Sequence, residues 1–136
     1  WEKAARGPAP RSVRYPWGDD DDFCSYVNHE RCGTGSVISV DDYPVNASHY
    51  GVRGMLANVI EWARDWYDAG YYATSPSLDP EGPPSATYCA IRGASRRNPV
   101  ESDGRYWALT HRLLGTVAAP GATWLGIRCV RQPWSE

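Results

Sequence analysis

Apolar residues along the chain occur in short clusters, and polar or Gly- and Pro-rich stretches separate them. Residues 1–7, WEKAARG, combine good helix formers with a terminal glycine and predict the last turns of a helix. The other clusters are short and bounded by turn residues, which is typical of strands. Strands are predicted at 88–95, 106–113 and 125–130, with a shorter one near 36–40 and a strand or irregular segment through Trp62 after a turn at 54–58.

Turns and loops take up much of the chain. Gly (13) and Pro (11) make up 24 of the 136 residues, which argues against a helix bundle. Long loops are predicted at 70–86, 96–104 and 115–123. Loops of this kind are either disordered or functional, and the seven Trp and nine Tyr favour ordered, functional loops. The pattern therefore predicts an α+β domain with short strands and few helices.

Length and charge narrow the classes of partner. A chain of 136 residues fits one domain. Its net charge of −2 gives no electrostatic basis for binding nucleic acid or an anionic membrane. No apolar run has the roughly 18–20 residues that cross a bilayer, and no signal peptide is visible. The acidic run 19–22 predicts a solvated turn, with a cation site as the alternative.

The four cysteines lack the spacing of a zinc site. They are Cys24, Cys32, Cys89 and Cys129, and no CxxC pair is present. Cys24 and Cys32 close a short loop and are able to form a disulfide. The alternative is four free thiols in a reducing compartment.

One glutamate stands in an apolar context. Glu61 lies between Ile60 and Trp62 in the stretch GMLANVIEWARDWY, residues 54–67. A buried carboxylate is costly unless donors or a cation pair with it. The stretch therefore marks a catalytic site, a metal site or a scaffold carboxylate that accepts hydrogen bonds.

Five separated blocks agree in order and spacing with one domain. They are WEKAARG (1–7), YPWGDD (15–20), YGVRGMLANVIEWARDWY (50–67), AIRGAS (90–95) and WLGIRCVR (124–131). Together they resemble the domain shared by the formylglycine-generating enzymes, the sulfatase-modifying factors. The resemblance implies a loop-rich α+β fold of the C-type-lectin-like, formylglycine-generating-enzyme type. It also implies that residues 1–136 are the C-terminal part of a single domain of this kind.

The resemblance also shows where catalysis would lie. The family's enzymes oxidise a substrate cysteine with oxygen, and they use two cysteines that bind copper(I), a soft metal that thiolates select. Those two positions fall on Asn98 and Asp103, and neither supplies a thiolate. Copper-dependent oxidation is therefore not expected.

A second enzyme class on this fold uses iron held by histidines to make sulfoxides. The histidines of this chain, His29, His49 and His111, are scattered and form no ligand grouping. This activity is not expected of these residues either.

Calcium is the one cofactor that the resemblance allows for. In relatives, a glutamate and two backbone carbonyls hold calcium, an ion that takes six to eight oxygen ligands. The matching residues are Glu61 with the carbonyls of Ala57 and Val59, but Gly54 replaces the acid or amide of the family. The resemblance implies a second calcium site at the side chain of Asn28 and the carbonyl of His29.

A binding role is the favoured prediction. The enzymes of the family keep their active surface where this chain has RRNPVESDGRYWALTHR, residues 96–112. Arg, Tyr and Trp dominate binding hot spots, while Ser, Gly and Asn supply adaptable hydrogen bonds. The predicted ligand-binding residues are Arg96, Arg97, Asn98, Glu101, Asp103, Arg105, Tyr106, Trp107, Thr110 and Trp124. The alternative is a solvated strand and loop with no ligand.

Variable proteins of diversity-generating retroelements resemble this chain in fold and in their C-terminal blocks. They diversify surface positions between an RGGSW block and a GFRCV block. A domain attached to a kinase, protease or other signalling protein is the second interpretation. A protein or peptide ligand is expected in both cases, with a glycan as the alternative. The Glu-Pro-Asn and Gln-Pro-Asp triplets of classical sugar-binding lectins are absent.

Overall fold

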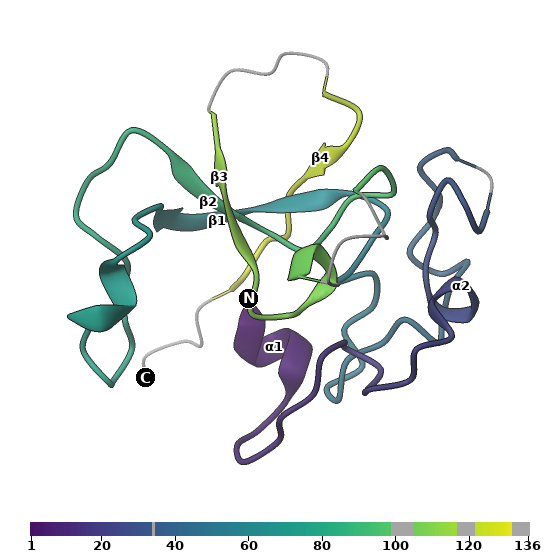
Figure 1. Cartoon of the computed structure of the whole chain (residues 1–136), viewed down its shortest axis with the longest axis horizontal. Coiled ribbons are helices and arrows are strands. Elements are labelled where there is room, and N and C mark those ends of the chain that lie inside the picture. The colour runs from purple at the N-terminus through teal and green to yellow at the C-terminus, as the bar shows by residue number, and fades with distance from the viewer. Residues whose placement is uncertain (34, 99–104, 117–121, 132–136) are drawn as a thin grey trace.

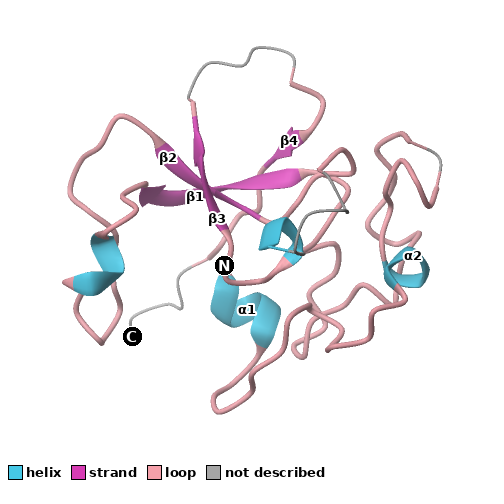
Figure 2. Ribbon diagram, in the orientation of Figure 1, coloured by secondary structure: helices cyan, strands magenta, loops and turns pink. Residues whose placement is uncertain are grey.

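A four-stranded sheet lies at the centre of the fold, and long loops surround it (Figures 1 and 2). The computed structural model describes residues 1–33, 35–98, 105–116 and 122–131, without the side chain of Arg105. Its elements are α1 (Glu2–Arg6), α2 (Phe23–Tyr26), β1 (Ile60–Trp66), η1 (Tyr71–Ala73), β2 (Cys89–Arg92), η2 (Arg105–Trp107), β3 (Arg112–Gly115) and β4 (Leu125–Gly126).

The strands lie in the order β3-β2-β1-β4. β1 and β2 pair antiparallel, as do β2 and β3, whereas β4 runs parallel to β1. Both edge strands are short, at four and two residues. The predicted α+β class with short strands and few helices is confirmed.

Several predicted element boundaries were wrong. Residues 36–40 form no strand, because the side chain of Asn58 binds both the N–H and the carbonyl of Ile38 at 3.1 Å each. Most of 106–113 is a 3₁₀ turn and loop, and the strand begins only at Arg112. The strand at 125–130 ends at Gly126, whereas β1 continues past Trp62 to pair with β2.

The sheet has one charged face and one apolar face. Residues opposite each other on paired strands project to the same face. Glu61, Arg92 and Arg112 are aligned in one row across β1, β2 and β3, and we call their side the charged face. The neighbouring row of Trp62, Ile91 and Leu113 belongs to the apolar face. The helix α1 packs at the charged face, where Glu2 forms a 2.8 Å ion pair with Arg92.

The hydrophobic core is built largely from loops. One cluster joins Tyr15, Val27, Leu56, Ala57, Ala94 and Trp107. A second cluster joins Ala5 of α1 to Met55 and Leu109. Segments distant in sequence thus depend on each other for burial, which explains how loops of this length stay ordered.

Two of the four cysteines are bonded. Cys24 and Cys32 form a disulfide, while Cys89 and Cys129 are free. Among the described residues, no helix has the length and apolar character needed to cross a membrane.

Candidate functional site

A tight turn opens the segment that was predicted to bind ligand. Gly93, directly after β2, has a φ of 76°, and a Cβ there would lie 3.0 Å from the carbonyl oxygen of Met55. Only glycine adopts this backbone and this approach without strain. Five residues after Gly93, Oδ1 of Asn98 accepts hydrogen bonds from the N–H of Ser95 at 2.6 Å and from its hydroxyl at 3.0 Å. Asn98 therefore closes the turn that carries it.

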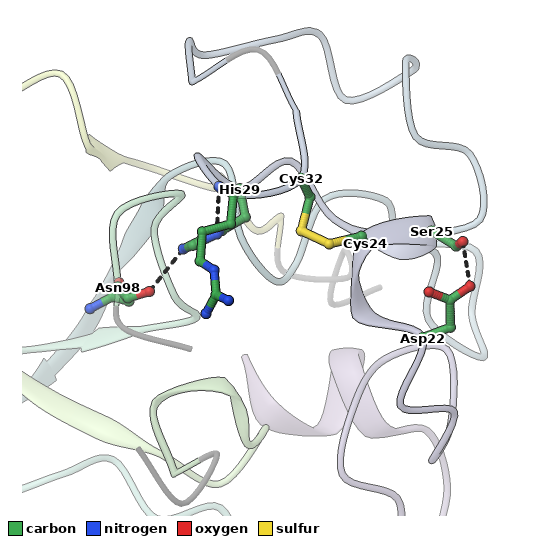
Figure 3. Close-up of a disulfide and its surroundings, with 7 residues drawn as sticks. Asp22, Cys24, Ser25, His29, Cys32 and Asn98 are labelled. Atoms are coloured by element: carbon green, nitrogen blue, oxygen red, sulfur yellow. Dashed lines mark hydrogen bonds between the residues drawn. A yellow bond between two sulfur atoms is a disulfide. The ribbon is translucent and has the colours of Figure 1, made fainter. Parts of the chain in front are cut away.

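The disulfide loop holds this turn from the other side, as Figure 3 shows for His29 and Asn98. Nε2 of His29 donates to the Asn98 carbonyl at 3.0 Å, while its Nδ1 accepts from the N–H of Arg31 at 3.2 Å. These two contacts require the proton on Nε2. The Glu30 carboxylate pairs with Arg97 at 2.8 Å, and the Glu30 N–H donates to the Arg96 carbonyl at 3.1 Å.

Two of the predicted binding residues belong to the interior. Arg96 is 5% exposed, and its Nε donates to the carbonyl of Gly35 at 2.8 Å. Trp107 is 1% exposed and packs edge to face with Phe23 at 4.4 Å and His29 at 5.4 Å. Both side chains support the surface from below and are closed to a ligand in this arrangement.

The accessible part of the predicted surface is smaller than the sequence indicated. Arg97 and Thr110 are exposed, and Asn98 and Tyr106 are half-buried. Trp124 is also exposed, at 37%, but it lies just before β4, the edge strand opposite β3, and its carbonyl accepts the Ile60 N–H. Glu101 and Asp103 lie outside the described residues, and of Arg105 only the backbone in η2 is described.

The carboxylate of Glu61 is engaged by two side chains. Nε1 of Trp1 donates to Oε2 at 2.7 Å, and Arg128 donates to both oxygens, at 3.1 Å from Nε and 2.8 Å from Nη2. The same Nη2 also contacts the carbonyl oxygens of Arg53 and Gly54, at 3.0 and 3.4 Å. A guanidinium thus supplies the positive charge that the buried carboxylate needs.

This donor set does not fit a calcium ion. Calcium at Glu61 would have to displace the Trp1 and Arg128 donors from the carboxylate oxygens. Ala57 and Val59 precede it in a loop where Ala57 and Asn58 both have positive φ, at 68° and 61°. Within the described part of the chain, no three His, Cys, Asp or Glu side chains come together as metal ligands. Calcium at Glu61, Ala57 and Val59 stays a prediction.

The two predicted ligands of the second calcium site differ in how far other groups already bind them. The His29 carbonyl already accepts the N–H groups of Cys32 and Gly33, both at 2.8 Å. The Asn28 Oδ1 is buried and has no hydrogen-bond partner in the described chain, and the same holds for Oδ1 of Asn46. Both asparagines line a cavity of about 10 Å³, close to the size of one water. A buried water fits these amide oxygens, and calcium at Asn28 and His29 stays a prediction.

The acidic run 19–22 is bound by local donors. Asp19 accepts the Arg14 N–H at 2.7 Å, and Asp20 accepts the N–H of Asp22 at 2.9 Å and the hydroxyl of Tyr26 at 2.8 Å. The Asp22 N–H foremost, and then the Tyr26 hydroxyl, lower the pKa of Asp20 from its ordinary value. The run thus forms a braced turn.

The disulfide should contribute measurably to stability. A Cys24→Ser/Cys32→Ser variant is expected to lose about 2–4 kcal/mol of unfolding free energy, because the open loop gains entropy in the unfolded state. Urea denaturation of both forms measures the loss. A Cys89→Ser variant, altered at a free thiol, should keep the wild-type response to reducing agent. Identical wild-type curves with and without reducing agent would show that the bond contributes nothing.

Comparison with known proteins assigns the chain to a family over nearly its whole length. The family model for the sulfatase-modifying factor enzyme 1-like domain matches residues 1–133. The chain belongs to this family. The predicted family and fold type are therefore confirmed.

The relatives that match this chain include two formylglycine-generating enzymes and a protein kinase. The formylglycine-generating enzyme of Thermomonospora curvata is 34% identical over 149 residues, which covers 98% of this chain and 47% of that protein. The formylglycine-generating enzyme of Streptomyces coelicolor is 35% identical over 107 residues, which covers 70% of this chain and 33% of that protein. The serine/threonine-protein kinase Pkn1 of Chlamydia trachomatis is 34% identical over 96% of this chain and 20% of the kinase. The chain therefore spans less than half the length of these relatives.

Solved structures share the fold. Treponema denticola variable protein 1 superposes with a TM-score of 0.74 at 23% identity, covering 93% of this chain and 43% of that one. PvdO from Pseudomonas aeruginosa superposes with a TM-score of 0.68 at 21% identity, covering 93% and 47%. At these identities the likeness is one of fold.

Proposed function

We propose that this domain is a non-catalytic binding module for a protein or peptide ligand. Its binding surface comprises the accessible residues Arg97, Asn98, Tyr106 and Thr110. Glu101, Asp103 and Arg105 belong to the same segment of sequence and stay predicted ligand-binding residues. Arg96 and Trp107 act beneath it as support.

Asn98 is the observation that carries the proposal. It stands where the resemblance to the family's enzymes expects the first copper-binding cysteine, and it cannot form a thiolate. Its side chain instead closes the turn through Ser95, and its carbonyl is held by His29. A turn braced from two sides presents neighbouring side chains in a fixed geometry, which lowers the entropy cost of binding.

A diversified surface of the retroelement kind is the finer version of this function. The fold shared with Treponema denticola variable protein 1 supports it. This version predicts a near-identical template repeat beside the gene, differing from the coding copy at adenines. Genome sequence without such a repeat rules this version out and leaves the binding function untouched.

The second candidate function is that of an accessory domain within a signalling enzyme. The likeness to the chlamydial kinases Pkn1, which match over nearly this whole chain, favours it. A kinase or other catalytic region in the same gene would support this candidate.

Selection from a displayed peptide library tests the binding surface. Peptides selected on the wild-type protein are expected to bind an Arg97→Ala variant about tenfold more weakly, as for a typical hot-spot residue. An Arg53→Ala variant is the matched control, because Arg53 is also exposed and ion-paired but lies outside this surface. Equal loss in both variants, or none, contradicts the assignment. Copper-dependent oxygen uptake with a cysteine peptide would contradict the non-catalytic assignment.

A further inference from the structure

A large cleft opens on the charged face of the sheet. Its volume is about 730 Å³, which lies within the usual range of ligand pockets. It is bounded by α1, by the charged face and by the loop that carries η1, the small teal-green helix at the left of Figure 1. Aromatic residues Trp1, Trp66, Tyr71 and Tyr72 are among those that line it. None of Arg97, Asn98, Tyr106 and Thr110 does, so this cleft is separate from the surface described above.

Two of the arginines in the cleft are already neutralised. Arg92 pairs with Glu2 at 2.8 Å and also donates to the carbonyls of Leu109, Thr110 and His111. Arg128 pairs with Glu61, as described above. These two side chains hold the sheet, α1 and the neighbouring loops together and have little left to offer a ligand.

Arg112 is different, because aromatic rings rather than carboxylates surround it. Its guanidinium carbon lies 4.2 Å from the ring centre of Tyr72 and 5.4 Å from that of Tyr67. In the described part of the chain it has no carboxylate within ion-pair distance. Stacking uses the faces of a guanidinium, while its N–H donors point outward in its plane. The N–H donors of the Arg112 guanidinium are therefore oriented to bind an oxyanion that approaches in the plane of the group.

The remaining charges select the kind of oxyanion. Lys3 and Arg64 line the cleft without a carboxylate partner, and Asp65 and Asp79 line it without a cationic partner, among the described residues. With Arg112, three cations stand against two carboxylates, so the excess is a single positive charge. A polyanion such as a polyphosphate would be repelled by the two aspartates. A ligand with one carboxylate and an apolar remainder fits both the charge and the aromatic walls.

We propose that this cleft is a second binding site, which takes a peptide carrying one carboxylate beside apolar side chains. The carboxylate accepts hydrogen bonds from Arg112. The apolar side chains pack against the aromatic residues of the walls. The proposal is independent of the surface around Asn98.

Two matched peptides test it, N-acetyl-Leu-Glu-Leu-amide and its N-acetyl-Leu-Gln-Leu-amide counterpart. Titrations followed by the NMR signals of arginine Nε–H groups measure both affinities. We expect the Glu peptide to bind about tenfold more tightly, as a charge-assisted hydrogen bond implies. Arg112→Gln should reduce this ratio to about one, whereas Arg53→Gln, altered outside both this cleft and the surface around Asn98, should leave it unchanged.

A second variant keeps the test independent of folding. Tyr72 is 57% exposed, and Tyr72→Leu removes the stacking ring with little effect on the core. It should lower the ratio severalfold while the circular dichroism spectrum stays that of the wild type. Equal affinity for the two peptides, no saturable shift with either, or full discrimination in Arg112→Gln would each overturn the proposal.

Discussion

Arg128→Ala is expected to lower the free energy of unfolding by about 3–5 kcal/mol, because it leaves a buried carboxylate without its cation. Glu61 is 4% exposed, and Arg128 donates to both of its oxygens. After the substitution, the indole N–H of Trp1 is the one side-chain donor to it that remains among the described residues. Chemical denaturation of the wild type and the variant measures the difference.

The control for this prediction is an exposed ion pair. Arg53 pairs with Asp41 at 2.6 Å, and both side chains are open to solvent. Arg53→Ala should therefore cost less than about 1 kcal/mol. A similar small loss in Arg128→Ala would show that Glu61 has another partner.

Calcium supplies the competing explanation for Glu61 and is tested with the same protein. Because Arg128 already satisfies the carboxylate, wild-type melting in calcium chloride and in EDTA should coincide. A melting temperature that rises with calcium, as expected for a ligand of the folded state alone, would restore the metal site at Glu61.

Trp107→Ala should also destabilise the protein by about 3–5 kcal/mol, the cost of removing a large buried aromatic side chain. The indole is 1% exposed and fills the larger core cluster beside Phe23 and His29. Thermal and urea denaturation both measure the change.

Thr110→Ala is the matched control, because Thr110 comes from the same predicted binding segment but is exposed. Its stability should stay within about 0.5 kcal/mol of the wild type. If Trp107→Ala were equally mild, the indole would be free for a ligand after all, and the division into support and surface would be incorrect.

The sequence predicts the family and the general fold better than it predicts where individual strands begin and end. The blocks of Gly, Trp and Arg were sufficient for the family and for a loop-rich α+β fold, because such residues are tied to particular turns and packing sites. The limits of the strands were harder to predict from the sequence. The segment 36–40 has the composition of a strand, but the side chain of Asn58, twenty residues away, binds its backbone instead. Contacts of this range leave no local signal.

For the candidate site, the sequence identifies individual residues but not which of them are exposed. Asn98 at the family's cysteine position is plain from the sequence, as is an unusual carboxylate at Glu61. The sequence also named Arg96, Arg97, Trp107 and Thr110 as one group. Residue type could not tell which of them face solvent, because Arg and Trp serve equally well as buried anchors and as contacts.

The sequence by itself determined the family, the class of fold and the absence of thiolates at Asn98 and Asp103. Only the tertiary structure decided the partner of Glu61, since Trp1 and Arg128 are 60 and 67 residues away and meet it through α1 and the segment after β4. It also decided that Arg112 belongs to the charged face, with tyrosines around it rather than carboxylates. A pattern along the chain records which residues are present, whereas charge compensation and burial depend on which residues the fold brings together.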